Sequence, residues 1–399
     1  MEKMTFAETT SSITSNYELV CSNCQKLYHK NQVQTFCTEC GSAPIVLKYA
    51  LQETSPEQVI DQTERSMWRY SKVLPLTHQE NRISLGEGWT PILPLSNLGK
   101  QLSLENLMLK DESFNPTGSF KARGLSMAVS KAKELGAETC IVPTAGNAGG
   151  ALSAYCAKAQ MHAIVVMPSH TPLAFQKECL AFGAALILVD GLIHDCAKKV
   201  AAIKQEINCF DISTMKEPYR LEGKKTLGYE IAEQLNWELP DVVLYPAGGG
   251  TGLIGIWKAF QEMKQMGWVK HIPTKMIAIQ AENCQPLVAT VNGWQENAAN
   301  YEGTATVANG LAVPRPFAER MMLDVLVQSD GEVLGISESE ITENLKEMAR
   351  VEGLLVAPEG AALLAGLKRL IKLNKIEKHH KVLLLNTGSA YKYLDNFSF

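Results

Sequence analysis

A single lysine, Lys121, stands in a sequence setting that suits covalent chemistry. It ends the stretch Asn115 to Lys121, which places it behind a turn and at the start of an expected helix. The positive end of the helix dipole disfavours the ammonium form of an amine at that position. The neutral amine is the form that attacks a carbonyl group and holds it as a Schiff base. Lys121 is therefore our candidate nucleophile, and it indicates a carbonyl cofactor.

A glycine-rich loop at residues 246–252 follows an expected strand and begins an expected helix. Backbone amides at such a turn, with a helix N-terminus behind them, form an anion site. The loop has neither the dinucleotide fingerprint G-x-G-x-x-G with its following acid nor a Walker motif, so it indicates a phosphate monoester. Glycines that serve helix packing alone are the alternative. The residues concerned are Gly248, Gly249, Gly250, Thr251 and Gly252.

Two further loops also end expected strands. Residues 144–147 can present backbone amides and a hydroxyl to a carboxylate, and the Asn147 amide can donate to a ring hydroxyl beside an imine. Thr387 follows the last expected strand. Ligands of open α/β sheets lie outside the carboxyl ends of the strands. A helix cap or a turn explains either loop alone, but together with Lys121 and the glycine loop they predict a pyridoxal phosphate site.

Four cysteines near the N-terminus form two pairs with the spacing of a metal site. Cys21 and Cys24 enclose two residues, as do Cys37 and Cys40, and twelve residues separate the pairs. Two knuckles of this kind place four thiolates tetrahedrally around Zn²⁺ and leave no open coordination position. We therefore expect a structural zinc site in a small ribbon. Four free thiols in a degenerate ribbon are the alternative.

The composition indicates a soluble, cytoplasmic protein. The 399 residues are 46% hydrophobic and carry a formal net charge of −4. No dominant basic stripe favours a nucleic-acid partner. Residues 1–16 lack the basic and apolar regions of a secretory signal, and no apolar run reaches the length of a membrane helix. The other six cysteines are scattered through apolar or helical stretches, so we expect them to be reduced core residues.

The elements that must position these residues alternate between strands and helices. This repeating unit predicts an α/β fold, with parallel sheets that carry helices on both faces. The expected strands cover residues 107–110, 139–144, 162–167, 185–189, 209–212, 242–245, 276–280 and 381–385. The expected helices cover residues 52–72, 119–135, 148–159, 172–182, 194–207, 224–235, 253–265, 337–352 and 361–372.

We expect the chain to divide into three parts. Residues 17–50 form the ribbon, and residues 115–213 form a small α/β domain that carries Lys121. Residues 51–114 and 214–399 together form a large cofactor-binding domain. The chain crosses to the second sheet around residues 216–222. An irregular segment at 284–310 is expected to cover the site.

With these motifs in place, the sequence resembles the fold type II pyridoxal-phosphate enzymes and, within them, the threonine synthases. The resemblance covers most of the chain from Leu85 onward. Gly86 to Pro91 is similar to the family's entry segment, Asn115 to Gly124 to its lysine motif, and Tyr219 to Thr226 to its domain-crossing motif. Long-form members also carry an N-terminal four-cysteine ribbon. The resemblance implies two doubly wound parallel-sheet domains of the tryptophan synthase β-like kind.

The resemblance also implies a role for each motif residue. Lys121 would be the Schiff-base lysine, and Phe120 would pack beside the cofactor ring. Asn147 would bond the ring hydroxyl, and Thr387 would face the pyridine nitrogen. Gly248 to Gly252 would hold the cofactor phosphate. On the substrate side, the carboxylate would be held by Thr144, Ala145, Gly146 and Asn147, and the substrate's own phosphate by Arg220.

The implied activity is that of a lyase in threonine biosynthesis, which converts O-phospho-L-homoserine and water to L-threonine and phosphate as a homodimer. Departures from the family keep an alternative open. Ala122 replaces an acid after the lysine, the glycine loop is closer to that of serine/threonine dehydratases, and Lys216 stands where an asparagine or serine contact is expected. A dehydratase, or a β- or γ-replacement synthase that uses another phosphorylated amino acid, is this alternative. Lys224 and Lys225 either lie near an anion site or form the solvated start of a helix.

Overall fold

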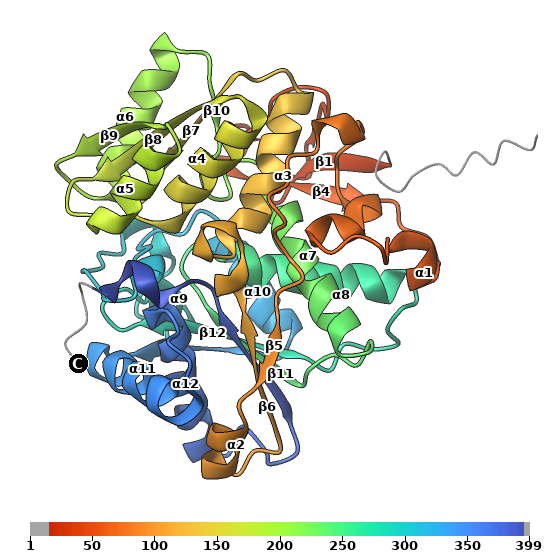
Figure 1. Cartoon of the computed structure of the whole chain (residues 1–399), viewed down its shortest axis with the longest axis vertical. Coiled ribbons are helices and arrows are strands. Elements are labelled where there is room, and N and C mark those ends of the chain that lie inside the picture. Colours follow the sequence, from red (N-terminus) through yellow and green to blue (C-terminus); the bar gives the residue numbers. More distant parts are fainter. Residues whose placement is uncertain (1–15, 395–399) are drawn as a thin grey trace, which may run out of the picture.

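The structure, a computed structural model, describes residues 16–394 and contains three β-sheets (Figure 1). Residues 1–15, where we expected no secretory signal, lie outside this part. Among the helices of residues 16–394, none combines the length and the apolar character that a membrane crossing requires. The division of the chain at residues 51, 115 and 214 stays a prediction.

The N-terminal sheet is the ribbon, with the strand order β2-β1-β4-β3. Its strands pair in antiparallel fashion, with Tyr17 opposite Tyr49 and Cys21 opposite Ile45. Cys21 ends β1 and Cys37 ends β3, so strand pairing brings the two cysteine pairs to the same end of the sheet. The strands are β1 (Tyr17–Cys21), β2 (Leu27–Tyr28), β3 (Phe36–Cys37) and β4 (Ala43–Tyr49).

The second sheet is parallel, as expected, with the order β10-β7-β8-β9. Residues alternate along its strands: Val142 packs in one apolar cluster with α4, whereas Ile141 and Val166 pack in another with α6. Helices therefore cover both faces. The strand bounds lie within one residue of the expected ones: β7 (Thr139–Pro143), β8 (His162–Pro168), β9 (Ala185–Val189) and β10 (Phe210–Asp211).

The third sheet has six strands in the order β13-β12-β11-β14-β6-β5. All are parallel except the edge strand β5, which pairs with β6 in antiparallel fashion. The last strand of the chain, β14, lies between β11 and β6. The strands are β5 (Ile92–Pro94), β6 (Asn106–Asp111), β11 (Val242–Pro246), β12 (Lys275–Ala281), β13 (Glu332–Ile336) and β14 (Lys381–Asn386).

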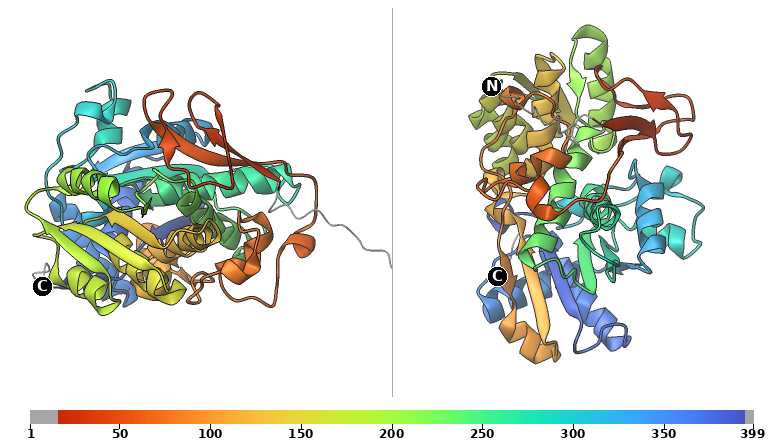
Figure 2. Two further views of the ribbon diagram at one scale, coloured as in Figure 1. Left: turned by 90° about the horizontal axis from the view of Figure 1, so that it is seen from above. Right: turned by 90° about the vertical axis from the view of Figure 1, so that its right-hand side faces the viewer.

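The helices surround the two parallel sheets (Figures 1 and 2). The first six are α1 (Pro56–Val59), α2 (Ser96–Leu102), α3 (Lys121–Glu134), α4 (Asn147–Ala159), α5 (Leu173–Ala181) and α6 (Ile193–Glu206). The other six are α7 (Tyr219–Gln234), α8 (Thr251–Gln265), α9 (Pro286–Val291), α10 (Glu319–Gln328), α11 (Glu338–Glu352) and α12 (Pro358–Lys372).

The prediction of one long helix at residues 52–72 is wrong. The chain forms the four-residue helix α1 and a separate 3₁₀ segment, Met67–Val73. Ile60 is extended and ends α1, and the Ser66 hydroxyl accepts a hydrogen bond from the Trp68 amide at the start of the second piece. A side chain that caps the backbone in this way competes with a continuous helix. The segment expected to be irregular, 284–310, likewise contains the helix α9.

The helix that crosses between the sheets, α7, begins at Tyr219, five residues before the expected start. Lys224 and Lys225 are fully buried, so the interpretation that they form a solvated helix start is wrong. The Lys225 ammonium lies 2.7 Å from the Glu222 carboxylate and 3.0 Å from Glu262. Carboxylates from α7 and α8 thus compensate a lysine that the sequence pattern alone would place in water.

A buried cluster of charges connects α3, α7 and β6. Glu230 on α7 lies 2.6 Å from the Lys110 ammonium and 2.8 Å from the Arg123 guanidinium, and none of these side chains reaches solvent. Arg123 also pairs with Glu112 at 2.7 Å. Burial alone would raise the pKa of Glu230, but the charges of Arg123 and Lys110 outweigh it and lower that pKa. The cluster fixes α3, which begins with Lys121, against α7.

Glu230→Gln removes the charge that compensates two buried cations. We expect it to lower the free energy of unfolding by about 3–5 kcal/mol, because breaking a buried pair leaves an uncompensated charge. The measurement is the urea midpoint. The control Asp330→Asn breaks an exposed pair with Lys275, and its midpoint should stay close to that of the wild type. Equal midpoints for Glu230→Gln and the wild type would contradict the importance of the cluster.

Candidate active site

A cavity of about 380 Å³ lies where the loops of the two parallel sheets meet. Its volume falls in the range of small-molecule sites. The loops of all the predicted cofactor motifs contribute to its wall, as expected for strands that end toward a shared ligand. The predicted site residues that line it are Phe120, Lys121, Thr144, Ala145, Gly146, Asn147, Gly248, Gly249, Gly250, Thr251 and Thr387.

Lys121 is the first residue of α3, as the sequence predicted. Its pKa falls to about 7, chiefly because of burial and secondly because of the Arg220 charge, while Glu359 opposes the change. The sequence argument named the helix dipole, whereas burial is the larger cause. Near neutral pH a substantial fraction of the amine is therefore uncharged and able to attack a carbonyl.

The turn before Lys121 is bound to the loop that follows the last strand. The Phe120 amide donates to the Thr387 carbonyl at 3.0 Å, and the Ser389 amide donates to the Gly118 carbonyl at 2.8 Å. Thr117 adopts a φ of +59° within this turn, a conformation that non-glycine residues rarely adopt. These bonds fix the lysine next to Thr387, although the two residues lie far apart in the sequence.

The glycine loop approaches its neighbours too closely for side chains. A Cβ at Gly248 would lie 2.1 Å from the Gly310 carbonyl oxygen, and Gly250 has a φ of +75° directly before α8. α8 begins directly after this loop, so the amides of its first turn lie at the end of the loop. Gly252 does not line the cavity, and its amide donates to the Tyr245 hydroxyl at 3.1 Å. Close packing against Tyr245 explains that glycine.

Asn147 is the first residue of α4, and Gly146 occupies the cap position. The alternative that Asn147 caps this helix is therefore wrong. Its side-chain oxygen accepts a hydrogen bond from the Lys392 ammonium at 3.1 Å. That bond orients the amide and leaves its Nδ2 group as the donor. The same loop is braced by the Thr144 hydroxyl, which accepts from the Gly146 amide at 3.1 Å.

Lys392 is a residue that the sequence motifs did not indicate. Besides Asn147, its ammonium donates to the Thr117 carbonyl at 2.7 Å and lies 2.7 Å from the Glu178 carboxylate. It thus connects the lysine turn, the start of α4 and α5. Its position five residues after Thr387 was the available signal, but only the fold shows which groups it reaches.

Arg220 does not line the cavity, but it lies close behind the wall and is buried. Its Nη1 group donates to the Ile212 carbonyl at 2.8 Å and to the Thr214 hydroxyl at 3.2 Å. Its Nε and Nη2 groups are buried without a hydrogen-bond partner among the described residues. Buried donors are rarely left unpaired, so this guanidinium is suited to an anion that enters the cavity beside Thr214.

Glu359 is a second residue of the cavity wall that the sequence argument missed. Its carboxylate accepts from the Gly310 amide at 2.6 Å and from the Tyr393 hydroxyl at 3.1 Å. Burial raises its pKa, while these hydrogen bonds and the charge of Lys121 oppose the change. Glu359 stands in the first turn of α12. Carboxylates are common there because they interact favourably with the helix dipole, so the sequence alone did not mark this residue as part of a site.

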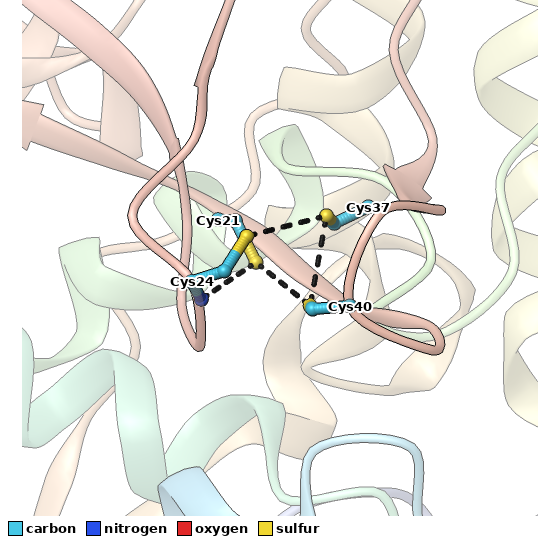
Figure 3. A group of neighbouring side chains, drawn as sticks. All are labelled: Cys21, Cys24, Cys37 and Cys40. Carbon is cyan, nitrogen blue, oxygen red and sulfur yellow. Dashed lines mark hydrogen bonds between the residues drawn. The ribbon is translucent and has the colours of Figure 1, made fainter.

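The four ribbon cysteines converge as their spacing predicted, and Figure 3 shows their sulfur atoms turned toward one another. All four sulfurs lie within 4.8 Å of one another. The distances from Cys40 to Cys21 and Cys37 are 3.5 and 3.6 Å, and that from Cys24 to Cys37 is 3.7 Å. A tetrahedral Zn²⁺ with 2.3 Å bonds needs sulfurs roughly 3.8 Å apart. The cluster therefore fits a structural zinc ion.

Comparisons with known proteins agree with this geometry. Residues 83–388 match the family described as "Pyridoxal-phosphate dependent enzyme". The chain is 33% identical to the threonine synthase of Methanocaldococcus jannaschii, over 93% of this chain and 92% of that protein. It is 32% identical to the threonine synthase of Methanosarcina acetivorans, over 94% and 92%.

A solved structure shows the same fold at lower identity. A pyridoxal 5'-phosphate-dependent aspartate racemase superposes with a TM-score of 0.67 at 18% identity, covering 77% of this chain and 92% of that one. At this identity the likeness concerns the fold alone. It bears out the α/β arrangement of two parallel sheets that the sequence predicted.

The lowered pKa of Lys121 predicts how fast pyridoxal phosphate attaches to the cofactor-free protein. Only the neutral amine attacks, so the attachment rate should rise with pH and reach half its maximum near the pKa of about 7. An ordinary lysine, with a pKa of about 10.4, would still be gaining rate far above that pH. The measurement is covalent attachment with time, trapped by borohydride and read by mass spectrometry. A rate that rises without levelling above neutral pH would contradict the assignment.

Proposed function

Since the chain belongs to the pyridoxal-phosphate-dependent enzymes and, within them, to the threonine synthase family, we propose that it converts O-phospho-L-homoserine and water to L-threonine and phosphate. One observation carries the proposal beyond family membership. The buried Arg220 keeps two unpaired donors beside the cavity that holds Lys121. An anionic substrate tail supplies what these donors lack.

The cavity fits pyridoxal phosphate. When bound, this group supplies an aldehyde that links to amines and a ring that takes up electron density from the substrate. Lys121 would hold the aldehyde, with Phe120 beside the ring. The amides from Gly248 to Thr251 would hold the phosphate, and Asn147 would donate to the ring hydroxyl. Thr387 would face the ring nitrogen with a neutral hydroxyl, which suits elimination and replacement better than transamination.

The substrate would lie between two loops. Its carboxylate would accept hydrogen bonds from the loop at residues 144–147, which is held open by the internal bond between Thr144 and Gly146. Its phosphate would approach Arg220, whose Nη1 group is already fixed by Thr214. This arrangement would set the carbon chain of the substrate across Lys121, where one amine would reach both the α and the β carbon.

Lys121 is the group suited to move protons. Its pKa of about 7 lets the freed amine accept a proton from the α carbon and return one later. Removal of a proton from the β carbon, loss of phosphate from the γ carbon, protonation of the γ carbon and addition of water at the β carbon would complete the conversion. The charges of Glu359 and Lys121 interact. The Glu359 carboxylate would therefore compensate the positive charge of the amine when it is protonated.

Three finer proposals accompany the activity. The protein would act as a homodimer in the cytoplasm, with the domain division at residues 51, 115 and 214 stated above. The family supports the dimer, and the small and large sheets support the division. Light scattering after size exclusion would report the mass directly, and a monomer at micromolar concentration would contradict the dimer.

Lys121→Ala should retain pyridoxal phosphate without a covalent link and lose turnover, because it lacks the amine with the lowered pKa that would attack the aldehyde and move the protons. The measurement is phosphate release from O-phosphohomoserine, with threonine confirmed by chromatography and covalent cofactor by mass spectrometry after borohydride. Lys133→Ala on the exposed face of the same helix is the control and should behave as the wild type. Normal turnover of Lys121→Ala would contradict its role. Keto acid from serine or threonine, without threonine from phosphohomoserine, would favour a dehydratase.

Arg220→Met replaces a buried guanidinium, two of whose nitrogen atoms lack a hydrogen-bond partner among the described residues, with an apolar side chain of similar length. We expect the Michaelis constant for the phosphorylated substrate to rise by about ten- to a hundredfold, the range of charge-assisted hydrogen bonds. Added phosphate should raise the melting temperature of the wild-type holoenzyme but not of this variant. The exposed Arg350→Met is the control. An unchanged Michaelis constant for Arg220→Met would place the substrate phosphate elsewhere.

A further inference from the structure

The ribbon contacts the wall of the cavity directly. Phe36 immediately precedes the metal-ligand candidate Cys37, and its ring meets the Phe317 ring edge-on at a centroid distance of 5.6 Å. Phe317 lines the cavity. The contact between Phe36 and Phe317 therefore connects the second cysteine pair to the wall of the cavity.

Lys216 lies beside both rings. Its ammonium is 5.9 Å from the centroid of Phe36 and 5.5 Å from that of Phe317, and the residue lines the cavity. Cations within about 6 Å of an aromatic face are attracted to it. Lys216 is half-buried, and no carboxylate among residues 16–394 lies within 4.0 Å of its ammonium, whereas the buried Lys110 and Lys225 each have one. Lys216 thus presents an unneutralised charge to the cavity.

The other cysteine pair is fixed to the same side of the cavity. Asn23, between Cys21 and Cys24, accepts a hydrogen bond from the Arg320 guanidinium at 2.7 Å. Arg320 belongs to the first turn of α10, three residues after Phe317. Each cysteine pair therefore has one contact with the segment that carries Phe317.

A second set of contacts fixes the body of the ribbon to α7 and α8, on which it lies in Figure 2. The Tyr49 hydroxyl donates to Glu222 at 2.8 Å, and the Lys258 ammonium donates to the Leu47 carbonyl at 2.8 Å. Glu222 stands two residues after Arg220. The ribbon is thus attached to α7, the helix that provides Arg220 near the proposed phosphate position.

From these contacts we infer that the ribbon completes the phosphate-binding side of the cavity. Phe36 is a positioning residue: together with Phe317 it holds the Lys216 ammonium toward the phosphate of the substrate. A metal ion on the four cysteines fixes Phe36 and so strengthens anion binding in a cavity that the metal never touches. The inference rests on the proposed function in one respect, because that function supplies the phosphorylated substrate.

The test uses the zinc- and cofactor-loaded protein and inorganic phosphate as the probe, measured by isothermal titration calorimetry. Phe36→Leu should keep its zinc and weaken phosphate binding by roughly three- to tenfold, the size of a lost cation–aromatic contact. The Michaelis constant for O-phosphohomoserine should rise by a similar factor, and the turnover number should change less. Phe36→Tyr, which keeps the ring, should restore wild-type binding.

Three further arms keep the test decisive. His29→Leu removes an exposed ring of the ribbon that touches no cavity residue, and it should bind phosphate as the wild type does. In the Lys216→Gln background, Phe36→Leu should cause no additional loss, since the group that it positions is gone. Removal of zinc by a chelator under reducing conditions should weaken phosphate binding at least as much as Phe36→Leu does.

Wild-type phosphate affinity in the zinc-loaded Phe36→Leu protein, or in the zinc-free protein, would overturn the inference. If Phe36→Leu loses its zinc, the comparison in the Lys216→Gln background decides: a further loss of affinity there would also overturn it. The outcome is separate from that of the proposed function. Phosphate affinity reports on the ribbon even if the turnover assay yields keto acid in place of threonine.

Discussion

The buried charge on Glu230 is the constraint around which the site is arranged. A carboxylate that is excluded from solvent needs nearby positive charges or hydrogen-bond donors. Glu230 is contacted by Lys110, Arg123 and two backbone amides. Arg123 follows Lys121 by two residues, and Glu230 shares α7 with Arg220. Compensation of one charge therefore sets the distance between the amine and the guanidinium. Such clusters contribute less to stability than to a unique arrangement, and position is what this site requires.

The cavity follows from that arrangement and from the direction of the strands. Two parallel sheets end their strands toward the same space, so loops that are distant in sequence become its walls. The low pKa of Lys121 then needs no special catalytic partner, because burial accounts for most of it. Lys392 adds the missing connection, since it binds the lysine turn and orients the amide of Asn147.

Sequence reasoning succeeded where local pattern decides structure. The eight strands that the sequence predicted lie within about a residue of the observed ones, and the cysteine spacing predicted the cluster that Figure 3 shows. It failed where distant residues decide. The buried Lys225 depends on Glu262, thirty-seven residues away, and the short strand β5 exists only because β6 lies beside it. Glu359 belongs to the cavity for reasons that no local motif records.

The position of β14 has a consequence for how the protein is made. This strand is the last of the chain, yet it occupies the middle of the six-stranded sheet, between β11 and β6. During synthesis, which proceeds from the N-terminus, the two halves of that sheet have no strand to join them until residues 381–386 leave the ribosome. Thr387, which closes the lysine turn, arrives with the same strand. A nascent chain therefore cannot assemble the cofactor pocket early, and a message truncated near its end would yield a protein whose large sheet stays open.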